Sequence, residues 1–270
     1  MTPAEKEAAE DPAGEQKLAE ALDRIVRAGA PRLQRPWHAL LATGGVAGFE
    51  VAIGVLVLVA VEHETGSTLL GGLAFSFGFI ALLLGHSELF TEGFLVPVTV
   101  VAAGEARLRD LLRLWVGTAV ANLAAGWVLA WIAMTAYPQL QSTAIHSAKF
   151  FIDAGITARS LCMAILAGAV ITLMTRMNTG TDSMPARVVA TIASAFVLAG
   201  LQMAHSILES LLIFTALQGH APFGYADWAG WFAWTVLGNL MGGLGLVTML
   251  RLVRSHGMLL RHRREASTAA

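Results

Sequence analysis

A long apolar run of the sequence is interrupted by Gly85-His86-Ser87-Glu88-Leu89-Phe90-Thr91, and this interruption decides the fold. The run covers residues 69–103, although a helix of about 20 apolar residues already crosses the hydrocarbon of a bilayer. A second run of this kind, residues 188–217, carries His205 and Glu209. Backbone that leaves the helix inside a membrane is tolerated where protein or a water-filled cavity surrounds it. We therefore predict two interrupted helices, each with its break inside the membrane.

The composition of the chain is that of a membrane protein. Of its 270 residues, 56% are hydrophobic and 14% are charged, with a mean hydropathy of +0.63, whereas soluble domains are about 45–50% apolar and about 25% charged. The net charge of −1 gives nucleic-acid binding no electrostatic support. A single cysteine, Cys162, excludes a disulfide framework and a CxxC or zinc-knuckle site. We expect no cleavable signal peptide, because the first 36 residues are polar and charged.

Basic residues decide how often the chain crosses the membrane. Four further apolar runs are each long enough for one crossing: residues 38–61, 114–136, 155–175 and 228–250. If each interrupted run counts as one crossing, the total is six, and sixteen of the eighteen Lys and Arg residues fall on one side. The loops on the other side hold Lys149. The positive-inside rule then places both termini in the cytoplasm.

Six crossings divide the chain into three parts. Residues 1–36 form a cytoplasmic N-terminal segment with a short amphipathic helix, which we expect on the membrane surface or packed under an oligomer. The apolar stripe of this helix consists of Leu18, Leu22, Ile25 and Val26. Residues 37–252 form the membrane domain, and residues 253–270 form a basic cytoplasmic tail.

The two halves of the membrane domain resemble each other. Three segments recur in order: residues 45–48 and 155–158, 86–90 and 205–209, and 122–126 and 239–243. The offsets of 110, 119 and 117 residues indicate a duplicated three-span unit at about 37–136 and 150–252. Because three is odd, the copies lie upside down relative to each other. We therefore predict an all-α membrane protein with six transmembrane helices in two inverted three-helix repeats, aquaporin-like in outline, with helices 2 and 5 broken.

Ionisable residues inside the predicted spans are costly and are functional hypotheses by default. They are Glu50, His86, Glu88, Arg159, and the pair of His205 and Glu209. We expect His86 and Glu88 either to bind free N–H groups of their loop or to act in function. His205 is either a neutral, pore-lining proton donor or a structural group, and with Glu209 alone it makes a weak metal site. Arg159 keeps its proton, so it must face water, an anion or a carboxylate. Direct contact with an anion and a buried ion pair both stay open, and for the ion pair we expect Glu209 first and Glu50 second.

The interrupted segment at residues 85–91 resembles the loop Gly-x-x-(Glu/Asp)-Leu-Phe-Thr of the formate/nitrite transporter family. The resemblance covers about residues 38–250. It includes Phe75-Ser76-x-Gly78, the helix with Trp115 and Asn122, Lys149, His205, and Gly238-Asn239-x-x-Gly242-Gly243. Residues 155–161 look like the YfdC-type branch of the family.

The resemblance implies a homopentamer in a bacterial-type inner membrane, with one pore per protomer for small monovalent anions or their neutral acids. It implies two hydrophobic constrictions, involving Phe75, Phe79, Leu89, Phe90 and Leu208. Thr91 and His205 would face the space between the constrictions, and Lys149 would make the outer vestibule positive. Arg159 and Glu209, which we also assign to the substrate or proton pathway, depart from the family, because typical members carry asparagine at both positions. No cofactor and no metal are implied.

An anion in a dry constriction loses its hydration at high cost. We expect Lys149 to concentrate the anion outside, and the low dielectric between the phenylalanine rings to favour its neutral form. His205, or a water that it holds, would supply the proton. Two other classes stay open: a neutral-solute channel of the aquaporin type, whose Asn-Pro-Ala signatures are absent, and a metal-dependent membrane enzyme that uses His205 and Glu209.

Overall fold

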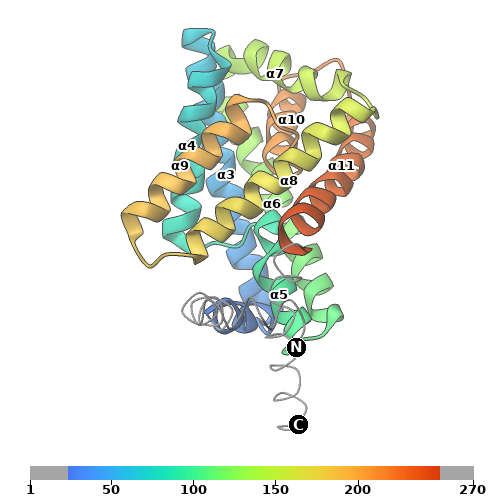
Figure 1. Cartoon of the computed structure of the whole chain (residues 1–270). Coiled ribbons are helices and arrows are strands. Elements are labelled where there is room, and N and C mark those ends of the chain that lie inside the picture. Colours follow the sequence, from blue (N-terminus) through green and yellow to red (C-terminus); the bar gives the residue numbers. More distant parts are fainter. Residues whose placement is uncertain (1–23, 250–270) are drawn as a thin grey trace.

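The computed structural model describes residues 24–249, and every regular element in that range is helical. A helical segment at residues 24–33 comes first (Figure 1). The elements that follow are α3 (Trp37–Thr65), α4 (Thr68–Gly85), η1 (Phe90–Phe94), α5 (Val96–Ala103), α6 (Leu108–Ala136), η2 (Pro138–Leu140), α7 (Gln141–Asp153), α8 (Ala158–Thr179), α9 (Met184–Gly200), α10 (Leu208–Gln218), α11 (Tyr225–Leu240) and η3 (Met241–Met249). The predicted all-α class is confirmed for these residues. The predicted tail at 253–270 lies outside them.

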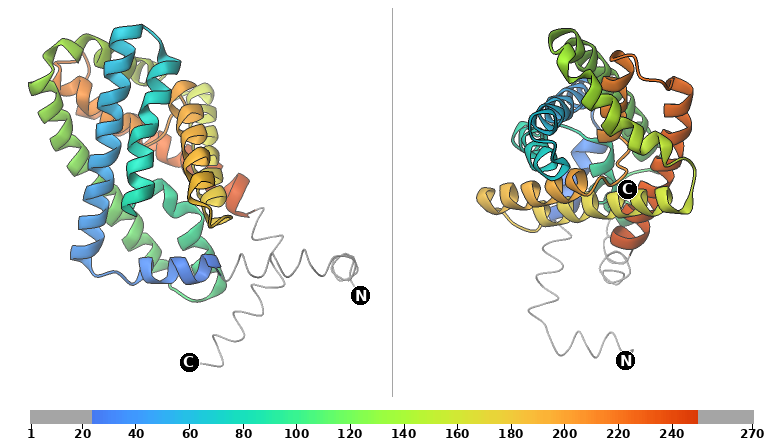
Figure 2. Two further views of the ribbon diagram at one scale, coloured as in Figure 1. Left: turned by 90° about the vertical axis from the view of Figure 1, so that its left-hand side faces the viewer. Right: turned by 90° about the horizontal axis from the view of Figure 1, so that it is seen from above.

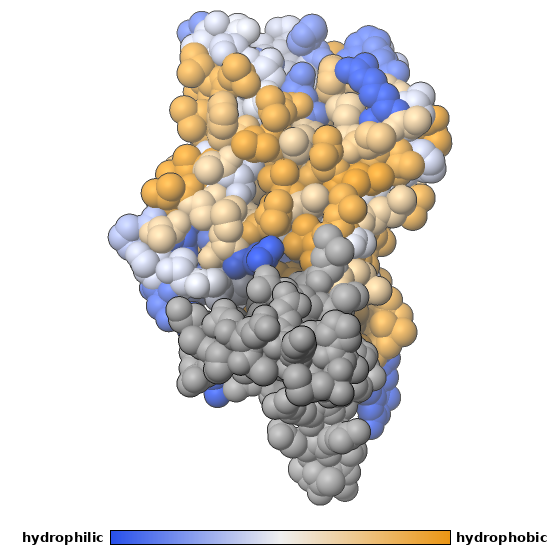
Figure 3. Space-filling view, viewed as in Figure 1, coloured by the Kyte–Doolittle hydropathy of each residue, from blue (hydrophilic) through white to orange (hydrophobic). Residues whose placement is uncertain are grey.

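Between residues 24 and 249, five helices are long and apolar enough to cross a membrane. They are α3, α4, α6, α8 and the continuous stretch Tyr225–Met249, which joins α11 to the π-helical η3. Shorter apolar helical segments are Phe90–Ala103, α9 and α10. Figure 3 shows apolar side chains over the middle of one face, a surface suited to contact with lipid or another protein copy.

At two corresponding places, one in each half, a helix ends beside a non-glycine residue in the left-handed conformation. α4 ends at Gly85, and His86 follows with a φ of 52°. α9 ends at Gly200, and Gln202 has a φ of 51°. This conformation ends a helix because it turns the backbone away from the helical path. A short irregular segment then leads to a new helix, which is η1 with α5 in the first half and α10 in the second.

Two helix pairs pack backbone to backbone at corresponding places. A Cβ atom on Gly48 of α3 would lie 2.2 Å from the carbonyl oxygen of Asn122 in α6. One on Gly168 of α8 would lie 2.1 Å from the carbonyl oxygen of Asn239 in α11. The asparagines are 117 residues apart, as predicted, whereas the glycines are 120 apart. The predicted offset of 110 for the first helices is wrong, since Gly155 lies in the turn before α8 with a φ of 59°.

The helical segment 24–33 packs on the protein itself. Ile25 and Val26 are buried, and a Cβ atom on Gly29 would lie 2.6 Å from the side chain of Val100 in α5. These two members of the predicted apolar stripe therefore contact their own chain and not a membrane surface. The other members of the stripe, Leu18 and Leu22, lie outside the described residues.

Helix α7 lies between the two halves, where no helix is predicted from the sequence. It covers the end of the molecule opposite α5, as Figure 1 and the left view of Figure 2 show. Its buried residues are Ala144, Ser147, Ala148 and Phe151. Spacings of three and four residues are those of an amphipathic helix, so this pattern could have predicted α7. Lys149 lies on the exposed side of the helix.

Candidate functional site

Asn122 of α6 holds the irregular segment that follows α4. Its side-chain oxygen accepts the backbone N–H of Phe90 at 3.0 Å. Its amide donates to the carbonyl of Glu88 at 3.0 Å and to that of Gly44 in α3 at 2.7 Å. A carboxamide offers an acceptor oxygen and two donor hydrogens, so this one buried side chain binds two backbone groups of the irregular segment, those of Phe90 and Glu88, and ties the segment to a carbonyl inside α3.

Asn239 of α11 repeats this arrangement at the irregular segment between α9 and α10. Its oxygen accepts the backbone N–H of Ser206 at 2.8 Å. Its amide donates to the carbonyls of Ala204 at 2.9 Å and Ala164 in α8 at 2.8 Å. Ser206 thus occupies the place of Phe90, which gives the two irregular segments an offset of 116 residues.

The predicted match between His86 and His205 is therefore wrong by three residues. His86 corresponds to Gln202, and the two share the left-handed backbone conformation. Leu89 corresponds to His205, so the histidine of the second half has an apolar counterpart. The recurrence of a His-Ser pair in both halves suggested the wrong alignment, because the structure repeats backbone bonding and not those side chains.

His205 is fully buried, and both of its ring nitrogens are hydrogen-bonded. Nδ1 accepts the backbone N–H of Leu208 at 3.0 Å. A nitrogen that accepts carries no hydrogen, so the neutral ring has its hydrogen on Nε2 and donates it to Thr91 Oγ1 at 2.7 Å. Thr91 is also fully buried, and its own hydroxyl hydrogen remains for another acceptor. The pair forms a neutral chain of hydrogen-bond donors.

Apolar side chains accompany this pair. The residues predicted to form constrictions are all buried: Phe75, Phe79, Leu89, Phe90 and Leu208. The ring centroid of Phe79 lies 6.5 Å from that of His205 and 4.8 Å from that of Phe75. In the first half, the segment with Leu89 leads directly into Thr91. The predicted apolar residues and the predicted polar pair are thus neighbours in the structure.

Glu209 lies buried in the first turn of α10, and its carboxylate accepts the backbone N–H of His205 at 2.7 Å. The partial positive charge of a helix N-terminus also favours a carboxylate there. Arg159 is exposed in the first turn of α8, where its guanidinium lies 5.7 Å from the ring centroid of Phe150. The predicted ion pair between Arg159 and Glu209 is wrong, because the arginine side chain is exposed and the carboxylate binds the backbone N–H of His205.

Glu50, the second predicted partner of Arg159, belongs to α3, and its carboxylate lies beside the end of α4. A Cβ atom on Gly85 would come within 2.5 Å of its Oε1 atom, and its side chain is hydrogen-bonded to Ser87. Its Oε2 atom is buried and has no hydrogen-bond partner within residues 24–249. Glu50 therefore supports the first irregular segment and not the arginine.

Two cavities of similar volume lie at opposite ends of the molecule. The first, of about 280 Å³, is lined by Glu62, Thr68, His146, Ser147, Lys149, Phe150, Asp153 and Gln202. A neighbouring space of about 20 Å³ is bordered by Leu208 and Glu209. Lys149 Nζ lies 2.5 Å from a carboxylate oxygen of Asp153, and Glu62 adds a further negative charge. This cavity therefore lacks the positive bias that Lys149 was expected to give it.

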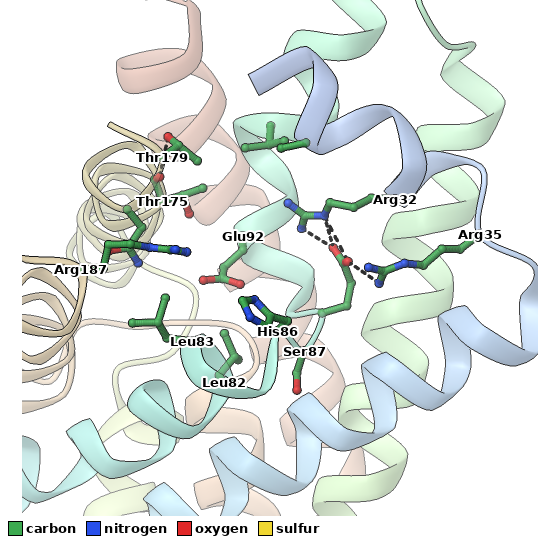
Figure 4. A pocket seen from close by; sticks show the side chains of 14 residues that line it. Arg32, Arg35, Leu82, Leu83, His86, Ser87, Glu92, Thr175, Thr179 and Arg187 are labelled. Carbon is green, nitrogen blue, oxygen red and sulfur yellow. Dashed lines mark hydrogen bonds and ion pairs between the residues drawn. The ribbon is translucent and has the colours of Figure 1, made fainter. Parts of the chain in front are cut away.

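The second cavity, also of about 280 Å³, lies beside residues 24–33 and the start of α9. Its charged and titratable lining consists of Arg32, Arg35, His86, Glu88, Glu92 and Arg187 (Figure 4). The carboxylate of Glu88 is buried and accepts hydrogen bonds from Arg32 Nε at 2.9 Å and from Arg35 Nη1 at 3.1 Å. Glu88 thus binds arginines, and our expectation that it binds loop N–H groups is wrong.

The arginines of this cavity were missed by sequence reasoning, which used them only to set the topology. The available signal was the position of Arg32 and Arg35, directly before the first span, at the end where the loop with Glu88 was predicted. Burial lowers the pKa of the Arg32 guanidinium, but the charge of Glu88 and its hydrogen bonds outweigh burial and raise the pKa. Arg32 therefore stays protonated.

Within residues 24–249, no group of three or more His, Cys, Asp or Glu side chains is placed to hold a metal ion. The nitrogens of His205 bind Leu208 and Thr91, and Glu209 binds a backbone N–H group. The metal-enzyme alternative therefore has no support at this site.

Comparisons with known proteins agree with this geometry. The family model described as "Formate/nitrite transporter" matches residues 19–253. Inner membrane protein YfdC of Escherichia coli (strain K12) is 24% identical over 251 residues, which cover 88% of this chain and 77% of that protein. A pentameric formate channel with formate bound superposes with a TM-score of 0.70 at 19% identity, over 80% of this chain and 96% of that one. An FNT family ion channel superposes with a TM-score of 0.73 at 16% identity, over 85% of this chain and 96% of that one.

Proposed function

Because the chain belongs to the formate/nitrite transporter family, it is a channel or transporter and not an enzyme, and we propose that it conducts small monovalent acids such as formate or nitrite. The buried hydrogen bond between Thr91 and His205 carries this proposal. It offers a polar donor among apolar side chains, between cavities that open at opposite ends. That arrangement suits a small solute that needs one hydrogen bond at the driest point of its path.

The Thr91–His205 pair also suggests how an acid would pass. An anion between phenylalanine rings would lose its hydration at high cost, whereas a neutral acid would not. Thr91 can donate its hydroxyl hydrogen to an oxygen of the solute, and His205 Nε2 supports the hydroxyl from behind. A proton on His205 Nδ1 would face the N–H of Leu208, so the ring acts here as a neutral donor. Transport would be proton-coupled because the proton crosses with the neutral acid.

The chain is a multi-pass inner membrane protein, and we propose six crossings for it. α3, α6, α8 and the stretch Tyr225–Met249 would each be one crossing. α4 with the segment Phe90–Ala103 would be one interrupted crossing, and α9 with α10 the other. The matched bonding of Asn122 and Asn239 supports two copies of one unit, and the distribution of Lys and Arg supports inverted copies with both termini in the cytoplasm.

We further propose a homopentamer with one path per protomer. The solved formate channel that this fold resembles is pentameric. Large apolar side chains stand exposed on α4 and on neighbouring helices, among them Leu69, Leu73 and Phe77. In each protomer, the five buried apolar residues named above would narrow the path on either side of Thr91 and His205.

Flux through proteoliposomes tests the proposal. Purified protein would be reconstituted and challenged with formate, nitrite, acetate, urea and water at pH 5.5 and 7.5. We expect formate and nitrite to enter faster than through protein-free vesicles, and faster at the lower pH. Entry of water or urea without any acid flux would favour the neutral-solute channel. No flux of any solute from a pentamer of normal size would refute both channel proposals.

A further inference from the structure

The two cavities at the ends of the molecule carry opposite net charge. The cavity beside residues 24–33, called here the arginine cavity, is lined by three arginines against two glutamates: Arg32, Arg35, Arg187, Glu88 and Glu92. The cavity under α7 is lined by one lysine against two acids: Lys149, Glu62 and Asp153. With the histidines neutral, the described linings differ by two charges, and the positive one lies at the end of the N-terminal helical segment.

Among the described residues, Arg187 is the arginine of this cavity that makes no ion pair with a carboxylate. Arg32 and Arg35 are both bound to Glu88. Arg187 extends from the first turn of α9 into the cavity toward Glu92 (Figure 4). Its Nε atom is buried and has no hydrogen-bond partner among the described residues. A buried donor without a partner is unusual, and a guanidinium fork matches the two oxygens of a carboxylate.

We propose that the arginine cavity is a capture site for a small monocarboxylate anion, with Arg187 as its main ligand. This inference rests on the proposed function and states at which end of the molecule the substrate is captured. The acid binds as an anion at the N-terminal end before it enters the apolar part of the path. The volume of about 280 Å³ admits an anion of a few atoms with its waters. The cavity under α7 offers no such site, because Asp153 binds its lysine.

One charge in a water-filled cavity sets the size of the effect. Two unit charges about 4 Å apart in water interact by about 1 kcal/mol, which is about fivefold in an equilibrium constant. Loss of the Arg187 charge should therefore raise the KM for formate about threefold to fivefold on the N-terminal side. The KM on the other side should not change, because the two cavities lie further apart than the distance of about 8–10 Å over which salt screens charges.

The test measures uptake of radiolabelled formate by everted and right-side-out membrane vesicles from a host without its own formate carriers. Proteolysis of the N-terminal tail assigns the sides. In everted vesicles, Arg187→Gln should raise the KM and leave the maximal rate unchanged, and Arg187→Lys should restore most of the affinity. The control Arg176→Gln removes an exposed arginine of α8 that does not line the cavity, and it should change neither constant.

A second measurement needs no variant and therefore does not depend on folding. Raising the salt from about 20 to about 300 mM should increase the wild-type KM on the N-terminal side, where it screens an attraction, and should not increase it on the other side, where the lining is net negative. Equal salt effects on both sides, or an unchanged KM for a pentameric Arg187→Gln variant, would overturn the capture site and leave the channel intact. Wild-type vesicles that take up no formate from either side would overturn the proposed function, and the capture site with it.

Discussion

Replacement of Asn239 by alanine should destabilise the protein strongly, because this buried side chain makes three hydrogen bonds to the backbone. The change removes three hydrogen bonds and leaves the N–H of Ser206 and the carbonyls of Ala204 and Ala164 buried without that partner. A net hydrogen bond contributes about 1 kcal/mol, or about 0.6 kcal/mol on average between transmembrane helices, so three bonds give about 2–3 kcal/mol. Unsatisfied buried groups add to this, and we expect a loss of about 3–5 kcal/mol.

The assay is thermal unfolding of the detergent-solubilised protein, followed by the loss of the intact oligomer in size-exclusion chromatography. At about 2–4 °C per kcal/mol for chains of this size, Tm should fall by roughly 10 °C. Asn122→Ala should cause a similar fall, because Asn122 makes the same three bonds in the first half. The matched control is Asn178→Ala, since Asn178 is buried and, among the described residues, makes one side-chain hydrogen bond, to Thr191 at 3.2 Å. If Asn239→Ala unfolds at no lower temperature than this control, the hydrogen bonds of Asn239 do not stabilise the irregular segment between α9 and α10.

Four other changes test the site. Thr91→Val should lower formate flux at least tenfold in proteoliposomes, because it removes the hydroxyl but keeps the shape, and Thr91→Ser should keep most of the flux. Phe90→Ala should raise flux and admit larger acids in the same assay; unchanged flux from an intact oligomer would show that Phe90 does not narrow the path. Arg159→Asn should shift Tm by less than about 2 °C, since the side chain is exposed. Asp153→Asn should lower the KM for formate on the α7 side by releasing Lys149, and a KM that stays the same there would argue against any role of that lysine.

The sequence predicts the membrane class, the two interruptions and the residues around His205, because these depend on local composition and on a loop motif. It does not predict which residues of the two halves correspond. His205 and His86 look alike in sequence, but the equivalence follows from the bonds of Asn122 and Asn239, which join segments more than thirty residues apart.

Pairing of charges was the other failure. Opposite charge alone suggests that Arg159 and Glu209 form an ion pair. In the structure each charge is stabilised separately, because Arg159 is exposed at the start of α8 and Glu209 lies at a buried helix N-terminus. Glu88 finds its partners in Arg32 and Arg35, from a segment outside the predicted spans. Such contacts depend on how the N-terminal segment folds back, which no periodicity in the sequence reports.

The two irregular segments bound by Asn122 and Asn239 also indicate where the two copies of a duplicated unit can differ in length. From Gly48 to His86 the chain takes 38 residues, and from Gly168 to Gln202 it takes 34. The difference is close to one helical turn of 3.6 residues, so the inward face of the helices is kept while their outer tips differ in length. Insertions and deletions can therefore accumulate at the tips without moving the middle. The cavities at the two ends can therefore change independently in evolution. Related proteins can then differ in which solutes bind at the ends of the path while sharing the same apolar middle.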